Sequence, residues 1–325
     1  MTEAGLGRLR DRAATSEARE AVETALHKRL QPILVRVTGR AGVGKSAIVS
    51  VLDSERLDAD GLEVQVHEGR TDNSAGEVLV HVIAGAVSPV DTAFLSSRPR
   101  GVPDGTVVVL TKADTLDDPS AAAATASAQL GRTVLPVMGT TAAGLRSVGR
   151  EGATLDMADV RAIAAADLRP ADLMTVDALI ECIELRGLVL LVDVVRQSTT
   201  VSDGDAMQVL ADATGADAMI AAVATAVSMA ATTRDGELHA ELRQISAGNR
   251  RVRSAVESYL ASDEAVAAEM RCAALRLGVP VQTDSERVVV EQAALWKQRA
   301  AASGGSDERR SALALCRGYV RMLTR

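Results

Sequence analysis

The sequence predicts a mixed α/β domain with a mainly parallel sheet, followed by an all-α helical domain. In the first half, short apolar runs rich in Val, Ile and Leu alternate with segments of helical character, a pattern typical of parallel α/β folds. From about residue 156 onward such runs become rare, and Ala, Leu, Arg and Glu recur at helical spacing. At 325 residues the chain is long enough for two domains. We expect an N-terminal helix within residues 1–30, packed on either domain, the α/β domain at 31–150 and a helical bundle domain at 151–325.

The composition limits the classes of partner. Hydrophobic residues make up 47% of the chain, but the only aromatic ones are Phe94, Tyr259, Trp296 and Tyr319, so the core is expected to be aliphatic. Single-stranded nucleic acid is commonly bound by stacking its bases on aromatic rings. The net charge of −7 also opposes a general attraction to DNA, RNA or anionic lipid. We therefore expect no nucleic-acid partner.

The cysteines indicate a reducing compartment. Cys182, Cys272 and Cys316 are far apart in the chain and lack the paired spacing of metal ligands. We interpret them as reduced thiols of a cytosolic protein.

The sequence offers little that would engage a membrane. No stretch approaches the roughly 18 to 20 apolar residues that a spanning helix needs, and the apolar run Ala218–Ala231 is expected to be a core helix. The N-terminal arginines are not followed by the apolar segment of a signal peptide. Arg250, Arg251 and Arg253 form a small basic cluster, which we interpret as a solvated helix face. The sequence thus predicts a cytoplasmic protein and leaves a peripheral position at the membrane open.

The most specific motif begins at the end of the first predicted strand. Residues 33–46 read ILVRVTGRAGVGKS, in which the strand Ile33–Val37 leads into Gly39-x4-Gly44-Lys45-Ser46 and a helix through Ala47–Leu52 follows. Glycines let successive backbone N–H groups turn inward around an anion, and the helix adds its positive dipole end. Lys45 is expected to reach the β- and γ-phosphates, and the Ser46 hydroxyl is expected to bind Mg²⁺.

This motif predicts a site for a nucleoside phosphate. The residues expected to contact the nucleotide here are Gly39, Arg40, Ala41, Gly42, Val43, Gly44, Lys45, Ser46 and Ala47, and Ser46 is also the expected metal ligand. Arg40 could point at the γ-phosphate as an internal arginine finger, although a solvent-facing side chain is the simpler interpretation.

Four more strands are expected along the first half. Gly61–His67 and Val78–Ala84 come first, and Val107–Leu110 ends in Thr111-Lys112-Ala113-Asp114. Residues just past a strand's carboxyl end line the ligand crevice of a parallel α/β sheet. That position makes Thr111, Lys112 and Asp114 candidates for reading the base of the nucleotide. The last strand, Thr133–Val137, precedes Gly139 and Thr140.

Together these motifs resemble the P-loop GTPases, whose base-specificity motif reads Asn/Thr-Lys-x-Asp. The resemblance implies a P-loop nucleotide-binding fold for residues 31–150, with GTP or GDP and Mg²⁺ as ligands. It implies that the Asp114 carboxylate accepts from N1–H and the 2-amino group of guanine, a pairing that adenine cannot satisfy, while Lys112 lies along the base. Gly139 and Thr140 match the position of the family's last base loop.

The region after Ser46 departs from this family. Only about 30 residues separate Ser46 from Val78, and His67-Glu68-Gly69-Arg70 does not match the family's Asp-x-x-Gly loop. Thr71 is our only candidate for the family's switch threonine. Glu68 and Asp72 could contact the metal indirectly or could be solvated loop charges. Since those switch elements normally support phosphoryl transfer, the chain is expected to bind guanine nucleotide better than it hydrolyses it.

The second half is expected to form a helical bundle or stalk. Glycine, proline and capping residues divide it into eight predicted helices. These are Met157–Asp167, Ala171–Gln197, Asp203–Ala213, Asp217–Thr232, Gly236–Ala261, Ser262–Leu277, Ser285–Ala302 and Asp307–Thr324.

The stretch from Asp177 to Leu190 resembles the segment that follows the G domain in bacterial, particularly actinobacterial, dynamin-like GTPases. This resemblance implies a shortened protein of that kind, with slow or partner-dependent GTP hydrolysis. It implies a helical domain for association with a protein partner, with itself or with another GTPase chain. Two alternatives stay open: an inactive structural or regulatory adaptor, and an ATP-binding P-loop enzyme in which Lys112 and Asp114 are coincidental.

Overall fold

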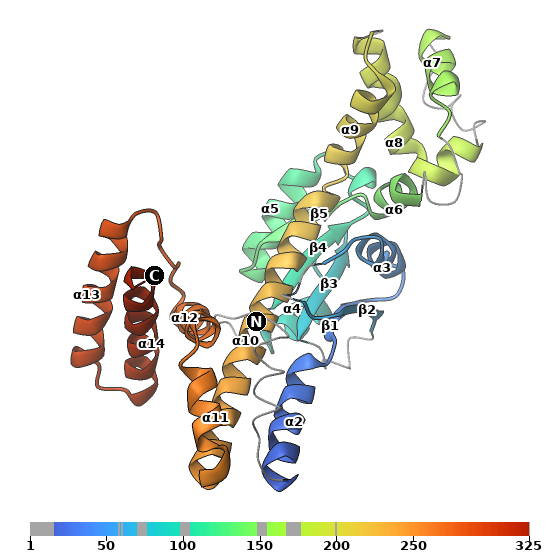
Figure 1. Cartoon of the computed structure of the whole chain (residues 1–325). Helices are drawn as coiled ribbons and strands as arrows, with labels where there is room; N and C mark the ends of the chain where they lie inside the picture. The colour runs from blue at the N-terminus through green and yellow to red at the C-terminus, as the bar shows by residue number, and fades with distance from the viewer. Residues whose placement is uncertain are drawn as a thin grey trace.

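The computed structural model describes residues 16–57, 59, 61–69, 77–97, 105–147, 155–166, 177–198 and 200–324. Its centre is a five-stranded sheet with helices around it, and a helical region follows (Figure 1). The strands are β1 Ile33–Gly39, β2 Val64–Glu68, β3 Val78–Ala84, β4 Thr106–Thr111 and β5 Val134–Val137. They lie in the order β2-β1-β3-β4-β5, and every neighbouring pair is parallel. The predicted parallel α/β arrangement and its five strands are confirmed.

Helices cover both faces of the sheet. In this part of the chain they are α3 Lys45–Asp53, α4 Pro89–Ser96, α5 Pro119–Leu130 and α6 Gly139–Ser147, with the short 3-10 helix η1 at Ala113–Thr115. Helix α2, Ser16–Leu30, lies beyond the end of the sheet (Figure 1). Alternate residues of a strand face opposite sides. Val80 and Val82 of β3 accordingly lie in one core with α3 and α6, whereas Ile83 lies in a second core with α4 and α5. Burial on both faces explains why these strands read as nearly continuous apolar runs.

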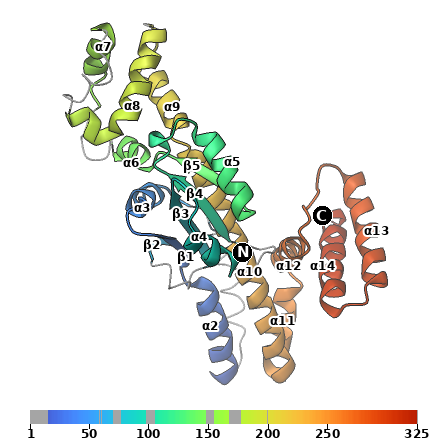
Figure 2. The same cartoon turned by 180° about the vertical axis from the view of Figure 1, so that it is seen from behind.

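The remaining helices lie toward the two ends of an elongated molecule. They are α7 Met157–Ala165, α8 Asp177–Gln197, α9 Asp203–Ala213, α10 Ala216–Gly248, α11 Arg250–Leu260, α12 Asp263–Leu277, α13 Glu286–Ala302 and α14 Ser306–Leu323. Helices α7 to α9 extend beyond one end of the sheet and α11 to α14 lie toward the other, as Figures 1 and 2 show from opposite sides.

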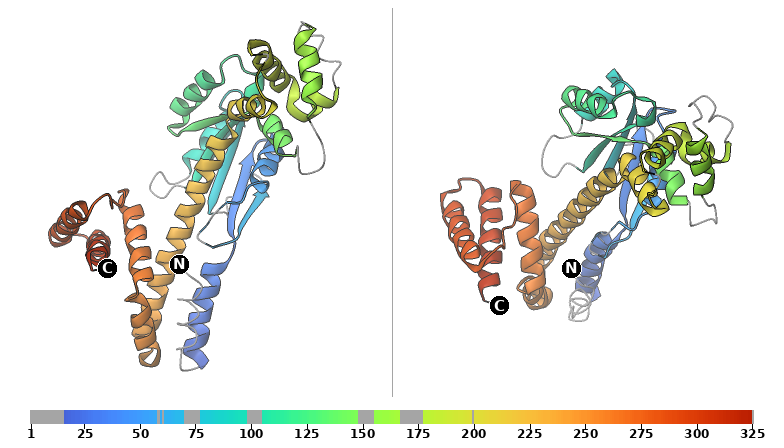
Figure 3. Two further views of the ribbon diagram at one scale, coloured as in Figure 1. Left: turned by 45° about the horizontal axis from the view of Figure 1, so that its top comes forward. Right: turned by 90° about the horizontal axis from the view of Figure 1, so that it is seen from above.

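The long helix α10 joins these parts. Its first half, including Met219, Val223 and Val227, packs in the sheet core that α3 also covers. Its second half packs through Leu238 and Leu242 against α2 and α11. Figure 3 shows it running along the sheet and past its edge. The boundary near residue 150 stays a prediction, but the helical region contributes directly to the core of the α/β part.

The expected helix break before Gly236 is wrong. Helix α10 continues through this position to Gly248, and Asn249 then starts α11 by accepting a hydrogen bond from the backbone N–H of Arg251 at 3.0 Å. The glycine serves close packing instead of termination, because a Cβ at Gly236 would lie 2.3 Å from the Cys272 Sγ. Here a tertiary contact, and not a turn, accounts for the glycine.

The expectation that no segment could span a bilayer also needs correction. Helix α10 is long and apolar enough by length and composition, with a mean hydropathy of 1.4 over an 18-residue window, of which 39% is buried. The same test is passed by core helices of soluble proteins, and the apolar residues of α10 pack on the sheet. A cytoplasmic or peripheral location stays a prediction.

A buried histidine lies where α10 meets α11 and α12. The His239 side chain is 1% exposed, with Nε2 3.4 Å from the hydroxyl of Tyr259. Burial, together with the positive charges of Arg243, Arg271 and Arg29, lowers the pKa of His239 to about 4. The fold therefore favours the neutral imidazole.

This burial predicts a pH-dependent stability. Because the pKa of His239 is about 4 in the folded chain and about 6.5 when unfolded, its contribution is complete above about pH 6.5. It is lost as the pH falls toward 4, and about 3 kcal/mol of unfolding free energy disappears. Urea unfolding between about pH 7 and pH 4 would show a steeper loss in the native chain than in His239→Gln, which keeps the contribution of other groups such as the buried His81. Equal slopes for both proteins would contradict the assignment.

Candidate functional site

The phosphate-loop motif lies where the order of the strands reverses. Strand β1 is flanked by β2 on one side and β3 on the other, although β2 and β3 are consecutive along the chain. Such a switch point opens a crevice at the carboxyl ends of the strands. Gly39 ends β1 and Thr111 ends β4, so the loops that follow them share this edge of the sheet. The topology therefore brings the two predicted motifs to one place.

The loop after β1 has the backbone conformation that its glycines allow. Gly42 and Gly44 have φ angles of 75° and 89°, which L side chains rarely adopt. Gly44 is the N-cap of α3, and no side chain in the described residues caps this helix. The first N–H groups of α3 are therefore available to an anion at the loop.

Lys45 and Ser46 both face a carboxylate at the end of β2. The Lys45 Nζ donates to the carbonyl oxygen of Arg40 at 2.9 Å and lies 3.6 Å from Glu68 Oε1. The Ser46 Oγ donates to Glu68 Oε2 at 2.9 Å. Of the two acidic candidates that the sequence left open, Glu68 is thus a direct neighbour of the phosphate loop, while Asp72 lies outside the described residues.

The oxygens of Ser46 and Glu68 are of the kind that binds Mg²⁺. Mg²⁺ prefers hard oxygen ligands and is commonly held by one or two protein oxygens together with phosphates and water. The Ser46 hydroxyl and the Glu68 carboxylate supply such oxygens side by side. Within the described ranges no group of three His, Cys, Asp or Glu side chains could hold a metal ion by itself. A metal at this site would therefore depend on the phosphates of a ligand.

Thr111 connects the base-loop motif to the phosphate loop. Its buried hydroxyl bonds the carbonyl oxygen of Val43 in the phosphate loop and that of Ile83 in β3, the latter at 3.0 Å. Lys112 follows in the left-handed region, with φ 56° and ψ 34°, and Asp114 lies half-buried in η1. The conformation at Lys112 turns the chain sharply from the strand into η1. The two motifs are thus one connected structure.

Gly139 and Thr140 also lie at this edge. They begin α6 directly after β5, and a Cβ at Gly139 would lie 3.4 Å from the Cβ of Ala47 in α3. Thr140 is exposed, and its side chain hydrogen-bonds that of Glu184. The last candidate loop therefore adjoins both the start of α3 and helix α8.

Glu184 is a site residue that sequence reasoning missed. It lies at a kink inside α8, with φ 56° and ψ 166°. Burial and the nearby Asp114 raise the pKa of Glu184. The hydrogen bonds from Thr140 and Thr141 favour the charged form and offset only part of this increase. The sequence predicts one continuous helix around Glu184 and does not indicate its contact with Thr140 and Thr141. That contact depends on how α8 packs on α6.

The kink is fixed by a close approach of two backbones. A Cβ at Gly144 of α6 would lie 1.7 Å from the carbonyl oxygen of Cys182 in α8. The Thr141 Oγ1 donates to the carbonyl oxygen of Ile183 at 3.0 Å. These contacts hold the carboxylate of Glu184 beside the base-loop motif.

Behind the phosphate loop, a buried polar chain connects three elements. His81 Nδ1 lies 3.2 Å from the Thr38 Oγ1, and its Nε2 lies 3.1 Å from Asp91 Oδ1. Burial lowers the pKa of His81; for Asp91 the hydrogen bonds from Ser88 and His81 outweigh burial and lower its pKa. A neutral His81 that accepts from Thr38 and donates to an ionised Asp91 satisfies both shifts. All three side chains are 0% exposed, so the chain supports the fold and is closed to a substrate.

The same network holds Arg40. Its Nε lies 3.4 Å from Asp91 Oδ2, and 40% of its side chain is exposed. The side chain is therefore neither free in solvent nor available to a phosphate without breaking an ion pair. The arginine-finger hypothesis stays a prediction. Thr71, the other weak catalytic candidate, lies outside the described residues.

Comparisons of the chain with protein-family models, with curated proteins and with solved structures found no match.

Thr111 offers a direct test of the connection between the motifs. We expect Thr111→Val to lower the unfolding free energy by about 1–3 kcal/mol, because it leaves the carbonyl oxygens of Val43 and Ile83 without this donor. Thr111→Ser keeps the hydroxyl and should lose less. The matched control is Thr125→Val, whose exposed hydroxyl bonds only its own helix and should change stability by less than about 0.5 kcal/mol. Urea unfolding measures all three, and similar values for Thr111→Val and Thr125→Val would refute the connection.

Proposed function

We propose that this chain binds a guanine nucleotide, GTP or GDP, with Mg²⁺, as a shortened protein similar to the P-loop GTPases. One observation carries the proposal. The Gly39-x4-Gly44-Lys45-Ser46 loop and the Thr111-Lys112-x-Asp114 loop adjoin at the switch point of a parallel sheet, joined by the Thr111 hydroxyl. A phosphate-binding motif and a base-reading motif in contact are what a nucleotide requires.

The phosphates would be held by the loop after β1. The uncapped N–H groups at the start of α3 and the ammonium of Lys45 supply positive charge to the β- and γ-phosphates. Mg²⁺, when bound, neutralises phosphate charge, and Ser46 and Glu68 are the residues that would hold it. Lys45 would exchange the carbonyl oxygen of Arg40 and its ion pair with Glu68 for phosphate oxygens.

The base would lie against the loop after β4. Asp114 would accept from the two N–H donors on the guanine edge, and Lys112 would lie along the base. The start of α6, at Gly139 and Thr140, would close the site from the side of β5. Glu184 brings a second carboxylate to this region, which adds acceptors to a site for a donor-rich base.

Hydrolysis by the isolated chain would be slow. Arg40 is paired with Asp91, and Glu68 is engaged by Lys45 and Ser46. Phosphoryl transfer depends on positioned water and on positive charge at the γ-phosphate. The ion pair with Asp91 holds Arg40 back from a phosphate, and Glu68, which would hold Mg²⁺ together with Ser46, is a carboxylate that supplies no positive charge. A partner GTPase chain, or a second copy of this one, would complete the site.

The helical domain would associate with a partner in the manner of a dynamin-like protein in the cytoplasm. Bound nucleotide would bias the arrangement of the helical domain through Glu184, because α8 connects the site to the neighbouring helices α7 and α9. Such coupling requires that the nucleotide contact the alternative arrangements differently.

Fluorescent GDP, GTP and ATP titrations, with and without Mg²⁺, test the nucleotide. We expect GDP and GTP to bind at least about 100-fold more tightly than ATP, because a base that covers the half-buried Asp114 carboxylate without pairing with it is rejected. Lys45→Ala should weaken the binding of every nucleotide, and Asp114→Ala should weaken the binding of guanine nucleotides only. The matched control is Asp117→Ala, which removes a nearby exposed carboxylate. ATP binding equal to that of GTP would favour the ATP-binding enzyme instead.

Phosphate release from the same GTP-loaded sample tests hydrolysis. Without a partner we expect turnover of roughly 0.001 per second or less, near the rate of GTPases that await a partner's arginine and below the roughly 0.01 per second of those with an internal one. Arg40→Ala should leave this rate unchanged, since its side chain is held by Asp91. Faster turnover that Arg40→Ala abolishes would show that Arg40 acts as an internal arginine finger.

A further inference from the structure

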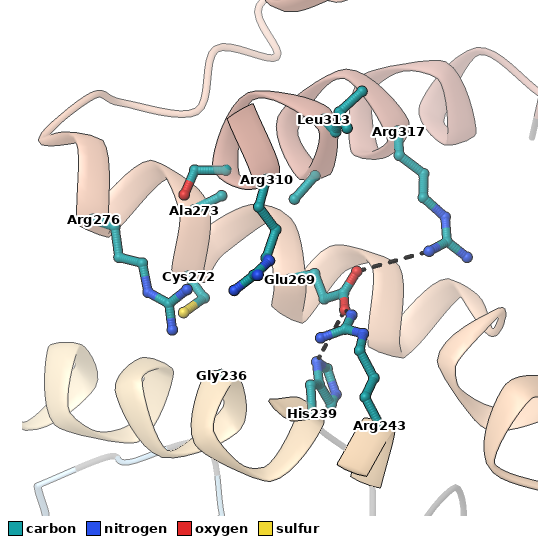
Figure 4. Close-up of a pocket in the computed structure, with 12 residues that line it drawn as sticks. Gly236, His239, Arg243, Glu269, Cys272, Ala273, Arg276, Arg310, Leu313 and Arg317 are labelled. Carbon is teal, nitrogen blue, oxygen red and sulfur yellow. Dashed lines mark ion pairs between the residues drawn. The ribbon is translucent and has the colours of Figure 1, made fainter. Parts of the chain in front are cut away.

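A cavity of about 270 Å³ lies between α10, α12 and α14. Four arginines surround it: Arg243 of α10, Arg276 of α12, and Arg310 and Arg317 of α14 (Figure 4). The chain as a whole carries a net charge of −7, so this gathering of positive charge is local.

The cavity holds too little negative charge to balance these arginines. Its only carboxylate among the lining residues is Glu269, which pairs with Arg243 and lies 3.8 Å from Nη1 of Arg317. The guanidinium of Arg276 has no carboxylate partner within the described part of the chain. Arg310 pairs, at 3.5 Å, with an exposed aspartate on its own helix that does not line the cavity.

The arginines are close enough to affect one another. Burial and the guanidinium groups of Arg317, Arg310 and Arg276 lower the pKa of Arg243. Like charges at this separation repel, and a single carboxylate offsets only part of that repulsion. An anion in the cavity would relieve it.

The floor of the cavity contains a polar atom without a partner. His239 is 1% exposed, and its Nδ1 has no hydrogen-bond partner among the described residues. Glu269 Oε1 lies 3.9 Å from this Nδ1, beyond hydrogen-bond distance. Buried polar groups usually have a partner, and the tautomer with hydrogen on Nδ1 could donate to a ligand oxygen.

We infer that this cavity binds the phosphate group of a small ligand. Arginine's planar fork matches phosphate oxygens in a bidentate manner, and the unpaired guanidinium of Arg276 and the Nδ1 of His239 face the same space. The volume lies at the small end of ligand pockets, which suits a phosphomonoester or a diphosphate. The site is formed by helices outside the sheet, and the inference does not depend on the proposed nucleotide site.

Inorganic pyrophosphate is the probe, and the Lys45→Ala background removes its binding to the phosphate loop. By isothermal titration calorimetry we expect this variant to bind pyrophosphate at one site. Adding Arg276→Gln and Arg310→Gln should weaken that binding by at least about tenfold, because each loses charge-assisted hydrogen bonds. Neither arginine pairs with Glu269, so the ion pairs between the helices stay intact. Higher ionic strength should weaken binding in the same direction.

The matched control is Arg287→Gln in the same background, which removes an exposed arginine of α13 that does not line the cavity. It should bind pyrophosphate as Lys45→Ala does. No binding to Lys45→Ala, or equal affinity with and without Arg276 and Arg310, would overturn the inference.

Co-sedimentation with phosphatidylcholine vesicles that contain phosphatidylinositol phosphate identifies the source of the phosphate. Sedimentation that is lost with Arg276→Gln and Arg310→Gln assigns the site to a lipid headgroup. Pyrophosphate binding without sedimentation assigns it to a soluble ligand, which is the result that we expect from a cavity of this size.

Discussion

The packing of α10 on the sheet is the constraint on which the molecule depends. This helix of 33 residues is about 50 Å long at the usual rise, so it reaches well past the strands that it covers. Its start is tied to the functional edge, because the N–H of Met138, just after β5, donates to the carbonyl oxygen of Thr214 at 2.9 Å. Its far half supplies the surface on which α2, α11 and α12 pack. The sheet and the helical region therefore share one structural element.

The sequence was sufficient where local chemistry determines structure. Strand β3 has the predicted bounds because its apolar run is buried on both faces, and the loop after β1 has the positive φ angles that its glycines allow. It was insufficient where distant contacts decide. A glycine occupies position 236, inside a helix, because Cys272 packs closely against it. Glu184 reaches the candidate site only because α8 packs on α6. Neither contact is indicated by a periodicity or a motif in the sequence.

Two buried histidines illustrate different electrostatic solutions in one chain. Burial lowers the pKa of both His81 and His239. His81 has a partner on each ring nitrogen and lies within a closed network that supports the phosphate loop. Among the described residues, His239 has the Tyr259 hydroxyl at Nε2 and no hydrogen-bond partner at Nδ1. The two side chains are thus equally buried but differ in how fully their ring nitrogens are hydrogen-bonded.

The conformation of Glu184 also has a mechanical consequence. A non-glycine residue in this region of φ and ψ costs about 1–3 kcal/mol, and the contacts of Gly144 and Thr141 with the preceding turn of α8 maintain it. The two segments of α8 are thus held at an angle under tension. Relaxation of this one residue to ordinary helical geometry would release that energy and straighten α8. The angle between the two segments of α8 is therefore set by the backbone dihedral angles of one residue, beside the carboxylate of Asp114.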